Sequence, residues 1–174
     1  MKWIALFSQT GSEIYEVSKR LGRFPDCVVT NKNNWDGINQ DLVESTIICY
    51  VGNKPDINQY NLHLRDDAII TLNGWLRIVP PEICKKYEIY NGHPGLITRL
   101  PELKGKDPQE KAFYNRHETA GCVIHEVVPE VDAGDILSEG SIPIKGLTLD
   151  AVYSKLHGIS VNLWVDFLKE KLKL

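Results

Sequence analysis

Short apolar runs alternate with amphipathic stretches along the first half of the chain. The runs, at 3–7, 26–30, 46–51 and 68–72, are bounded by polar or glycine-containing turns. Such runs are typical of parallel strands that are covered on both faces. The stretches between them, beginning with 13–21, have helical spacing, so the pattern predicts a parallel sheet with right-handed crossovers.

The pattern in the second half of the chain predicts that one edge of that sheet is antiparallel. Residues 121–128 and 136–144 have strand patterns and are joined only by a short turn, so we expect them to pair antiparallel. A long apolar stripe predicts a final helix at 148–171. The predicted fold is therefore a single α/β domain over 1–174, with a mostly parallel, Rossmann-like sheet flanked by helices and an antiparallel edge.

The segment between these halves is less regular. Residues 97–105 have no apolar periodicity and are expected to form a polar, solvated loop. Residues 108–117 are expected to form a helix with Asp107 as its N-cap.

Composition and charge exclude several classes of protein. A length of 174 residues suits one domain, and a net charge of −3 without a dense basic block argues against a nucleic-acid or anionic-membrane binder. The longest apolar runs have strand length, too short for a membrane span or a signal peptide. The 4 cysteines are far apart and suggest neither a zinc site nor a disulfide framework. We expect a cytoplasmic protein.

Two polar segments carry the candidate chemistry. In the first, a strand beginning at Ile89 leads into Asn91 and His93, whose side chains leave an extended backbone on the same face. Asn91 can donate an amide N–H to a developing oxyanion, and His93 can pass a proton near neutral pH. In the second, Asp132 precedes a turn of small residues and can orient an imidazole. The plain interpretation of such motifs in isolation is a solvent-facing histidine and an ordinary acidic turn.

The order of motifs resembles the folate-dependent formyltransferases almost from end to end. The motifs are Gly74-Trp-Leu-Arg-Ile-Val79, Asn91-Gly-His-Pro94, Gly121-x3-His125 and Glu130-Val-Asp-Ala-Gly134. The catalytic Asn, His and Asp of that family correspond by position to Asn91, His93 and Asp132. The resemblance implies a formyltransferase-type fold, a one-carbon transferase activity, 10-formyltetrahydrofolate as co-substrate and no metal.

The resemblance also implies residues around the reactive trio. The implied cofactor-binding residues are Leu76, Arg77, Val79 and Glu130, with the first three forming a wall against the pterin. His125 is implied as a support for Asp132, and Lys104 and Lys106 would face the glutamate tail of a folate. The residues alone leave another interpretation open for each of these. The wall segment could be a connector that packs in the core, and His125 could be an ordinary core histidine. Arg77 could instead pair with a carboxylate in the core.

The turn after the first strand is the candidate site for the amine acceptor. The implied acceptor-binding residues are Thr10, Gly11, Ser12 and Glu13. Helix N-termini attract anions, although this turn has neither a Walker nor a dinucleotide-binding pattern, and an ordinary strand–helix connection remains open. In the resembled family the loop cradles a phosphate, is richer in glycine and carries Asn in place of Glu13. We therefore expect Glu13 to disfavour phosphate by like-charge repulsion.

The acceptor itself stays open at this point. Overall similarity favours glycinamide ribonucleotide in purine biosynthesis, whereas the turn favours a sugar amine or another primary amine. Hydrolysis of 10-formyltetrahydrofolate is a second reaction for the same trio, and a folate- or nucleotide-binding module is the alternative without catalysis. The expected partners are folate and a small amine, with no nucleic acid or membrane, and a homodimer is left open.

Overall fold

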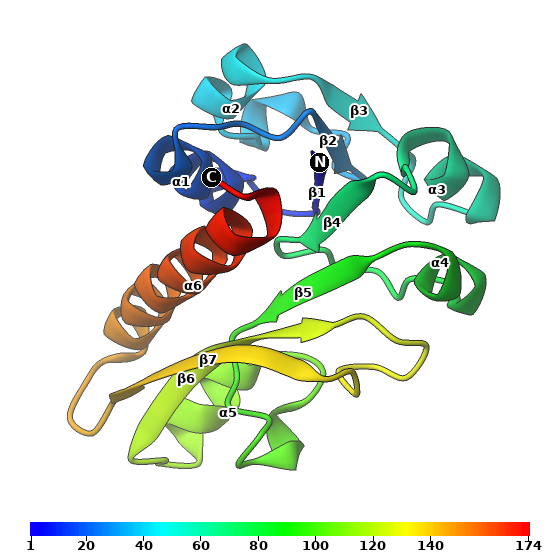
Figure 1. Cartoon of the computed structure of the whole chain (residues 1–174). Coiled ribbons are helices and arrows are strands. Elements are labelled where there is room, and N and C mark those ends of the chain that lie inside the picture. The colour runs from blue at the N-terminus through cyan, green and yellow to red at the C-terminus, as the bar shows by residue number, and fades with distance from the viewer.

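A seven-stranded sheet in the order β3-β2-β1-β4-β5-β6-β7 runs through the protein, whose computed structural model describes all residues 1–174 (Figure 1). The strands are β1 (Lys2–Phe7), β2 (Cys27–Thr30), β3 (Ile48–Tyr50), β4 (Ala68–Leu72), β5 (Ile89–His93), β6 (Thr119–Glu126) and β7 (Ile136–Pro143). Strands β1 to β5 are parallel, while β6 is antiparallel to both β5 and β7. The predicted mostly parallel α/β fold with an antiparallel edge is confirmed.

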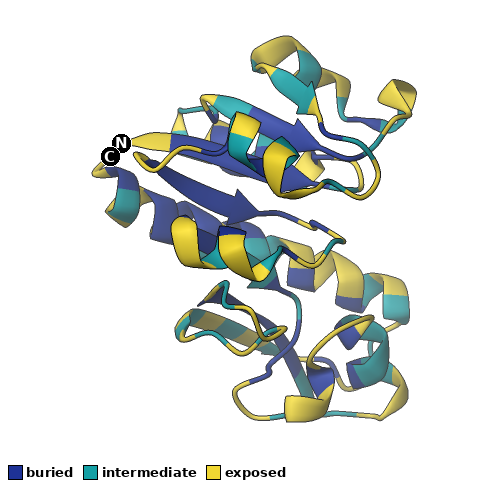
Figure 2. Ribbon diagram, turned by 90° about the vertical axis from the view of Figure 1, so that its right-hand side faces the viewer, coloured by how far each residue is buried: buried dark blue, intermediate teal, exposed yellow.

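Helices cover both faces of the parallel strands. They are α1 (Ser12–Leu21), α2 (Gln40–Ser45), α3 (Ile57–His63), α4 (Pro81–Lys86), α5 (Pro108–Tyr114) and α6 (Leu149–Leu172), with 3-10 turns η1 (Trp35–Gly37) and η2 (Pro101–Leu103). In Figure 1, α1 and α6 lie on one side of the sheet and α3 and α4 on the other. Figure 2 shows the buried strands between helices whose outer surfaces are exposed.

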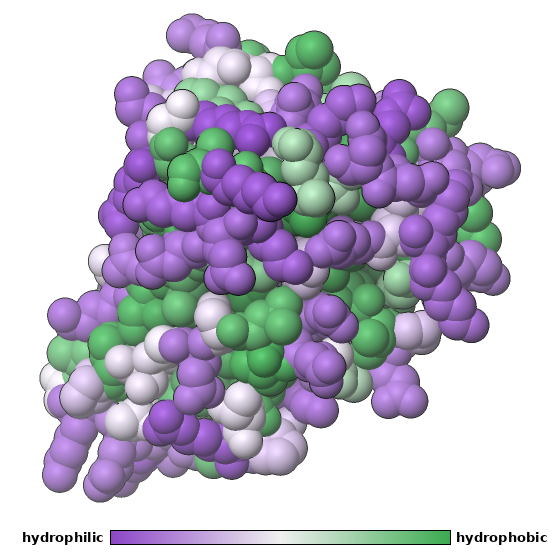
Figure 3. Space-filling view, viewed as in Figure 1, coloured by the Kyte–Doolittle hydropathy of each residue, from purple (hydrophilic) through white to green (hydrophobic).

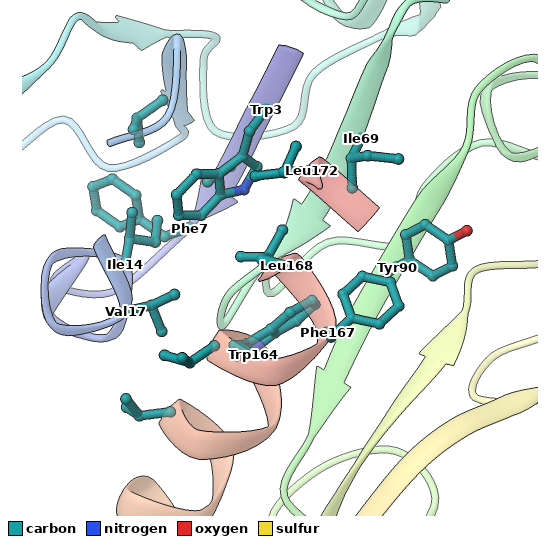
Figure 4. Close-up of a cluster of buried hydrophobic side chains, with 14 of the residues drawn as sticks. Trp3, Phe7, Ile14, Val17, Ile69, Tyr90, Trp164, Phe167, Leu168 and Leu172 are labelled. Atoms are coloured by element: carbon teal, nitrogen blue, oxygen red, sulfur yellow. The ribbon is translucent and has the colours of Figure 1, made fainter. Parts of the chain in front are cut away.

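Two apolar cores flank strand β1 because its side chains alternate between the two faces. Trp3, Ala5 and Phe7 face the core shared with α1 and α6, and Ile4 and Leu6 face the core shared with α3 and α4. Figure 4 shows the first core, where side chains of α6 meet those of α1 and β1. Each fully buried Ile, Leu or Phe contributes about 1.5–3 kcal/mol, so these cores hold the strand ends in place.

Hydrophilic residues cover much of the face shown in Figure 3, in agreement with helices whose apolar stripes face the sheet. The long helix α6 is capped by Thr148, whose hydroxyl oxygen accepts the N–H of Ala151 at 3.2 Å. None of the helices combines the length and the apolar character that a bilayer span needs.

Two local predictions were wrong. The stretch 97–105 is not simply a solvated loop, because Ile97 and Leu103 are buried in an apolar cluster with α5 and β6. Asp107 does precede α5, but it has a left-handed φ of 55° and its side chain makes no capping hydrogen bond, and the helix ends at Tyr114. Helical periodicity therefore located α5, but the sequence did not show that the preceding loop is anchored in the core.

Candidate active site

A cleft of about 1050 Å³ opens at the carboxyl ends of β1, β4 and β5. Strand order reverses between β1 and β4, the place where open α/β sheets bind ligands. Every predicted site residue lines this cleft, namely Thr10, Gly11, Ser12, Glu13, Leu76, Arg77, Val79, Asn91, His93, His125, Glu130 and Asp132. The fold thus brings together four segments that are far apart in the sequence.

Asp132 lies between two imidazole rings. Its Oδ2 is 3.5 Å from Nδ1 of His93, and its Oδ1 is 3.3 Å from Nε2 of His125. The side chains of His93, His125 and Asp132 are 6%, 3% and 8% exposed, so the cluster is screened from bulk water. No set of three or more His, Cys, Asp or Glu side chains in the protein has the arrangement of a metal site.

Backbone carbonyls fix the tautomers of both rings. Nε2 of His93 is 2.8 Å from the carbonyl oxygen of Leu103, and Nδ1 of His125 is 2.7 Å from that of Glu126. A carbonyl only accepts hydrogen bonds, so each of these nitrogens carries a hydrogen. In the neutral rings, the nitrogen that faces Asp132 is therefore the one with the lone pair. A proton added to either ring would lie between imidazole and carboxylate.

Asn91 determines which ring takes that proton. It pairs with His125 across β5 and β6, and its Nδ2 is 3.2 Å from Nε2 of His125. The amide therefore donates one N–H to the unprotonated Nε2 and retains a second N–H. Because this hydrogen bond needs a neutral His125, the extra proton falls to the pair of His93 and Asp132.

Burial and charge set the ionisation of that pair in opposite ways. Burial lowers the pKa of His93, and this effect outweighs the raising effect of the Asp132 carboxylate. Burial raises the pKa of Asp132, but the neighbouring His125 and His93 rings and the hydrogen bond from the Gly105 amide together hold that pKa below its ordinary value. At neutral pH the pair is a neutral imidazole beside a carboxylate.

One unusual conformation and one close backbone approach place Asp132. Asp132 itself has a left-handed φ of 51°. Gly134 packs so closely on β6 that a Cβ atom there would lie 1.9 Å from the carbonyl oxygen of Glu126, which only glycine permits. The amide of Gly105 donates to Oδ2 of Asp132 at 2.8 Å, so the 97–105 loop closes over the carboxylate.

Apolar side chains form the mouth of the cleft. Leu76, Ile78 and Val131 are 58%, 75% and 53% exposed and line the opening. Ligand-binding clefts are commonly lined by apolar side chains of this kind. Ile78 is the most exposed of them and was not among the predicted wall residues.

The other predicted wall residues differ in their surroundings. The guanidinium of Arg77 donates to the carbonyl and side-chain oxygens of Asn53 at 2.7 and 2.6 Å, so it does not pair with a core carboxylate. Val79 is 5% exposed and belongs mainly to the core behind the cleft. Glu130 is exposed at the rim.

The turn at the start of α1 has backbone groups free for a ligand. Gly11 takes a left-handed φ of 75°, and the backbone N–H groups of Glu13 and Ile14 have no acceptor inside the protein; of these two residues, Glu13 lines the cleft and Ile14 is fully buried. The hydroxyls of Thr10 and Ser12 hydrogen-bond to each other at 3.1 Å. The carboxylate of Glu13 is turned toward Asn73, just after β4, and toward Ser160 in the middle of α6.

Four further groups at the site were not found from the sequence. The carbonyl of Leu103 and the amide of Gly105 are backbone groups, which no residue pattern identifies. Asn73 and Ser160 donate to the two oxygens of Glu13 at 2.9 and 2.8 Å. Asn73 follows β4 directly, and a polar residue at a strand end was a usable signal. Ser160 lies within an apolar helix pattern and gave none.

Comparison with known proteins agrees with this geometry. A family model described as formyl transferase matches residues 1–168. The crystal structure of phosphoribosylglycinamide formyltransferase from Anaplasma phagocytophilum superposes with a TM-score of 0.84 and 27% identity, over 97% of this chain and 85% of that chain.

Curated sequences show the same likeness over shorter stretches. The phosphoribosylglycinamide formyltransferase of Dictyostelium discoideum is 33% identical over 113 residues, which are 58% of this chain and 53% of that protein. The methionyl-tRNA formyltransferase of Thermotoga maritima is 30% identical over 124 residues, which are 70% of this chain and 38% of that protein. The chain spans between 8% and 53% of the length of the first curated relatives. Because the family model takes in nearly all of its residues, and as its motifs predicted, the chain belongs to the formyl transferase family.

Proposed function

We propose that residues 1–174 form a catalytic domain that transfers a formyl group from 10-formyltetrahydrofolate to a primary amine. The observation that carries this proposal is the buried Asp132 between His93 and His125, with both lone-pair nitrogens facing it and Asn91 alongside. Such a cluster can store one proton beside a hydrogen-bond donor, which is what acyl transfer to an amine requires. A module that only binds folate has no use for it.

The cleft suits a folate together with a small acceptor. Its volume of about 1050 Å³ lies at the upper end of ligand sites, which measure roughly 300–1,000 Å³. The flat pterin would lie against the 76–79 segment and the 130–132 turn, where Leu76, Ile78 and Val131 supply apolar surface. Lys106 lines the same cleft and suits the carboxylates of a glutamate tail.

Each member of the cluster has a distinct task. The co-substrate supplies the formyl group. Asn91 offers its second N–H to the formyl oxygen, where negative charge develops. The amine nitrogen bonds to the formyl carbon and His93 takes up the amine proton at Nδ1, while Asp132 stabilises the resulting imidazolium. Asp132 also orders the water that carries this proton to N10 of the tetrahydrofolate as the bond between the formyl carbon and N10 breaks. His125 supports both, since its Nε2 holds the Asn91 amide and lies 3.3 Å from Asp132.

Two acceptors are supported by different observations. Relatives named phosphoribosylglycinamide formyltransferase, and the free N–H groups at the start of α1, support glycinamide ribonucleotide and a place in purine biosynthesis. The Glu13 carboxylate in the cleft supports an amine without phosphate, such as a sugar amine. In either case Thr10, Gly11 and Ser12 would contact the acceptor.

The setting of the reaction completes the proposal. We place it in the cytoplasm, with folate and a small amine as partners and without a resident metal. A net charge of −3 argues against a nucleic-acid acceptor. A homodimer is the assembly to look for by size-exclusion chromatography.

The test combines the purified protein, 10-formyltetrahydrofolate and a panel of primary amines, with absorbance reporting the released folate. We expect release that depends on the amine and saturates with it. Equal release without amine would identify a hydrolase instead, and folate binding without any release would identify a binding module.

A further inference from the structure

We infer that Glu13 selects the acceptor, and that the part of the acceptor beside it presents N–H or O–H donors rather than a phosphate. This inference rests on the proposed function and deepens it. The substrate class it names is an unphosphorylated amine, of which a sugar amine is the simplest example. The inference rests on a series of hydrogen-bonded, buried side chains that holds the Glu13 carboxylate facing the cleft.

That chain of hydrogen bonds has a fixed direction. Nε1 of Trp3 donates to the hydroxyl of Thr71 at 2.9 Å, and that hydroxyl donates to Oδ1 of Asn73 at 2.8 Å. The Thr71 hydroxyl accepts from the indole and gives its own hydrogen to Oδ1 of Asn73, and because the Glu13 carboxylate can only accept, the Asn73 amide turns its NH2 group toward Glu13. Trp3 and Thr71 are fully buried and Asn73 is 7% exposed, so water does not replace these partners.

Glu13 therefore faces the NH2 group of Asn73, which needs a hydrogen-bond acceptor. Nδ2 of Asn73 donates to its Oε1 at 2.9 Å, and the hydroxyl of Ser160 on α6 donates to its Oε2 at 2.8 Å. A carboxylate has about four lone-pair sites, so roughly two remain after these bonds. Glu13 lines the cleft, which leaves those sites available to a ligand.

No cation of the protein neutralises this carboxylate. Glu13 forms no ion pair, and the guanidinium of Arg77 is held by Asn53. Nε2 of His157, on the same face of α6, is 2.8 Å from the carboxylate of Glu16. The start of α1 attracts anions, but its partial charge of about half a unit is smaller than the full charge of the carboxylate beside it. A phosphate in this position would therefore meet net repulsion.

The carboxylate is also close to the reaction centre. Leu72, the last residue of β4, pairs with Asn91 in the β4–β5 register, and Asn73, which holds Glu13, follows Leu72 directly. Adjacent strands lie about 4.8 Å apart, so an acceptor held by Glu13 can extend its amine toward Asn91. Glu13 thus acts on substrate choice, while Asn73, Thr71 and Trp3 position it.

The experiment compares two acceptors that differ only in phosphate, glycinamide ribonucleotide and the same riboside without its phosphate. Wild type should prefer the unphosphorylated riboside at least tenfold in kcat/KM. Glu13→Gln should shift that preference at least tenfold toward the ribonucleotide and leave the KM for folate unchanged. Thr71→Val removes the hydroxyl that links Trp3 to Asn73 in the hydrogen bonds supporting Glu13. It should shift the acceptor preference in the same direction by a smaller factor. Glu44→Gln, exposed on α2, is the matched control and should shift nothing.

Calorimetric titration of both acceptors into the same proteins keeps this test separate from that of the proposed function. Stronger binding of the unphosphorylated riboside that is lost in Glu13→Gln supports the inference even when no formyl transfer occurs. A wild-type preference for the ribonucleotide, or a preference that Glu13→Gln leaves unchanged in both assays, overturns it. Circular dichroism establishes that each variant is folded.

Discussion

The two ends of the cleft are held by different kinds of partner. At the proposed reaction end, made of Asn91, His93, His125 and Asp132, backbone groups from Leu103, Glu126 and Gly105 fix the side chains. At the acceptor end, Glu13 is fixed by other side chains, those of Asn73 and Ser160, with Thr71 and Trp3 behind. Substitution cannot remove a backbone carbonyl, whereas it readily removes a hydroxyl or an amide.

This difference suggests how one fold keeps a reaction and changes its acceptor. The tautomers of His93 and His125 are set by backbone carbonyls, so they are kept wherever the fold is kept. The acceptor end depends on a few side chains whose replacement leaves the strands in place. Substitutions at the reaction end should therefore reduce the rate for every acceptor, and substitutions at the acceptor end should change the order of preference.

The largest effect is expected from the reaction end itself. His93→Ala and Asp132→Asn should each reduce kcat at saturating amine by at least about a hundredfold, because positioned proton transfer contributes roughly 10²–10⁴-fold. Folate binding should remain, since neither substitution changes the apolar side chains at the mouth of the cleft. Near-normal turnover in either variant, with any acceptor, would remove that residue from the mechanism and abolish the distinction between the two ends.

A smaller loss is expected from Gly92, which lies between Asn91 and His93 on β5. A Cβ atom there would be 2.7 Å from Nε1 of the buried Trp164 on α6. Gly92→Ala should therefore displace β5, destabilise the protein by about 1–3 kcal/mol, and lower kcat by roughly tenfold to a hundredfold. Urea denaturation and steady-state kinetics measure the two effects.

Gly158→Ala is the matched control for that substitution. Gly158 lies within α6, and nothing is within 4 Å of the position its Cβ would take. Alanine there should stabilise the helix by about 0.5–1 kcal/mol and leave kcat unchanged. Equal behaviour of the two alanine variants would show that Trp164 does not position the reaction end.

The position of the proposed reaction end was largely predictable from the sequence, since its side chains lie on recognisable strands and in the turn that joins two of them. The apolar run before Asn91 placed it and His93 at a strand end, and the small residues after Asp132 marked a tight turn. The antiparallel pairing of β6 and β7 followed from the shortness of that turn. The main strands were located because apolar runs determine them directly.

The supports of both ends were not predictable, for physical reasons. Leu103 and Gly105 act through backbone groups in a segment without periodicity, and the burial of that loop depends on packing against α5 and β6. Glu13 meets Asn73 and Ser160 across 60 and 147 positions of sequence, so its direction depends on the assembled fold. The sequence indicated a charge in the turn but not where that charge points.

The apolar mouth of the cleft, formed by Leu76, Ile78 and Val131, belongs to neither end and should behave differently from both. Ile78→Ser, which removes a 75% exposed apolar side chain at the mouth, should raise the KM for folate by about tenfold with kcat and acceptor preference unchanged. Covering an Ile side chain fully contributes about 1.5–3 kcal/mol, and a tenfold effect, about 1.4 kcal/mol, lies just below that range, as expected for a side chain that is only partly covered. Leu62→Ser, on α3 and 68% exposed outside the cleft, is the control. An unchanged KM for folate in Ile78→Ser would show that the pterin does not lie against this segment.

The smallest effect concerns pH and stability at the reaction end. The folded pKa of His93 is lowered, mainly by burial, so below about pH 6.5 the unfolded chain binds a proton that the folded protein does not. The free energy of unfolding should therefore fall as pH decreases from 7 to 5. Asp132, whose folded pKa is also lowered, contributes stability that is lost only at lower pH, as its own carboxylate becomes protonated.

Urea midpoints at pH 7, 6 and 5 should show this decline in wild type and a shallower one in His93→Gln, which lacks the titrating group. The slope should not vanish, because burial also lowers the pKa of His63 on α3, and that histidine contributes with the same sign. His63→Gln, far from the cleft, provides the matched comparison. The decisive result is the sign, since stability that rises below pH 6.5 and loses this rise in His93→Gln would show that His93 is protonated against Asp132 in the folded protein. The reaction end would then hold its extra proton before any amine arrives, and His93 could not act as the base.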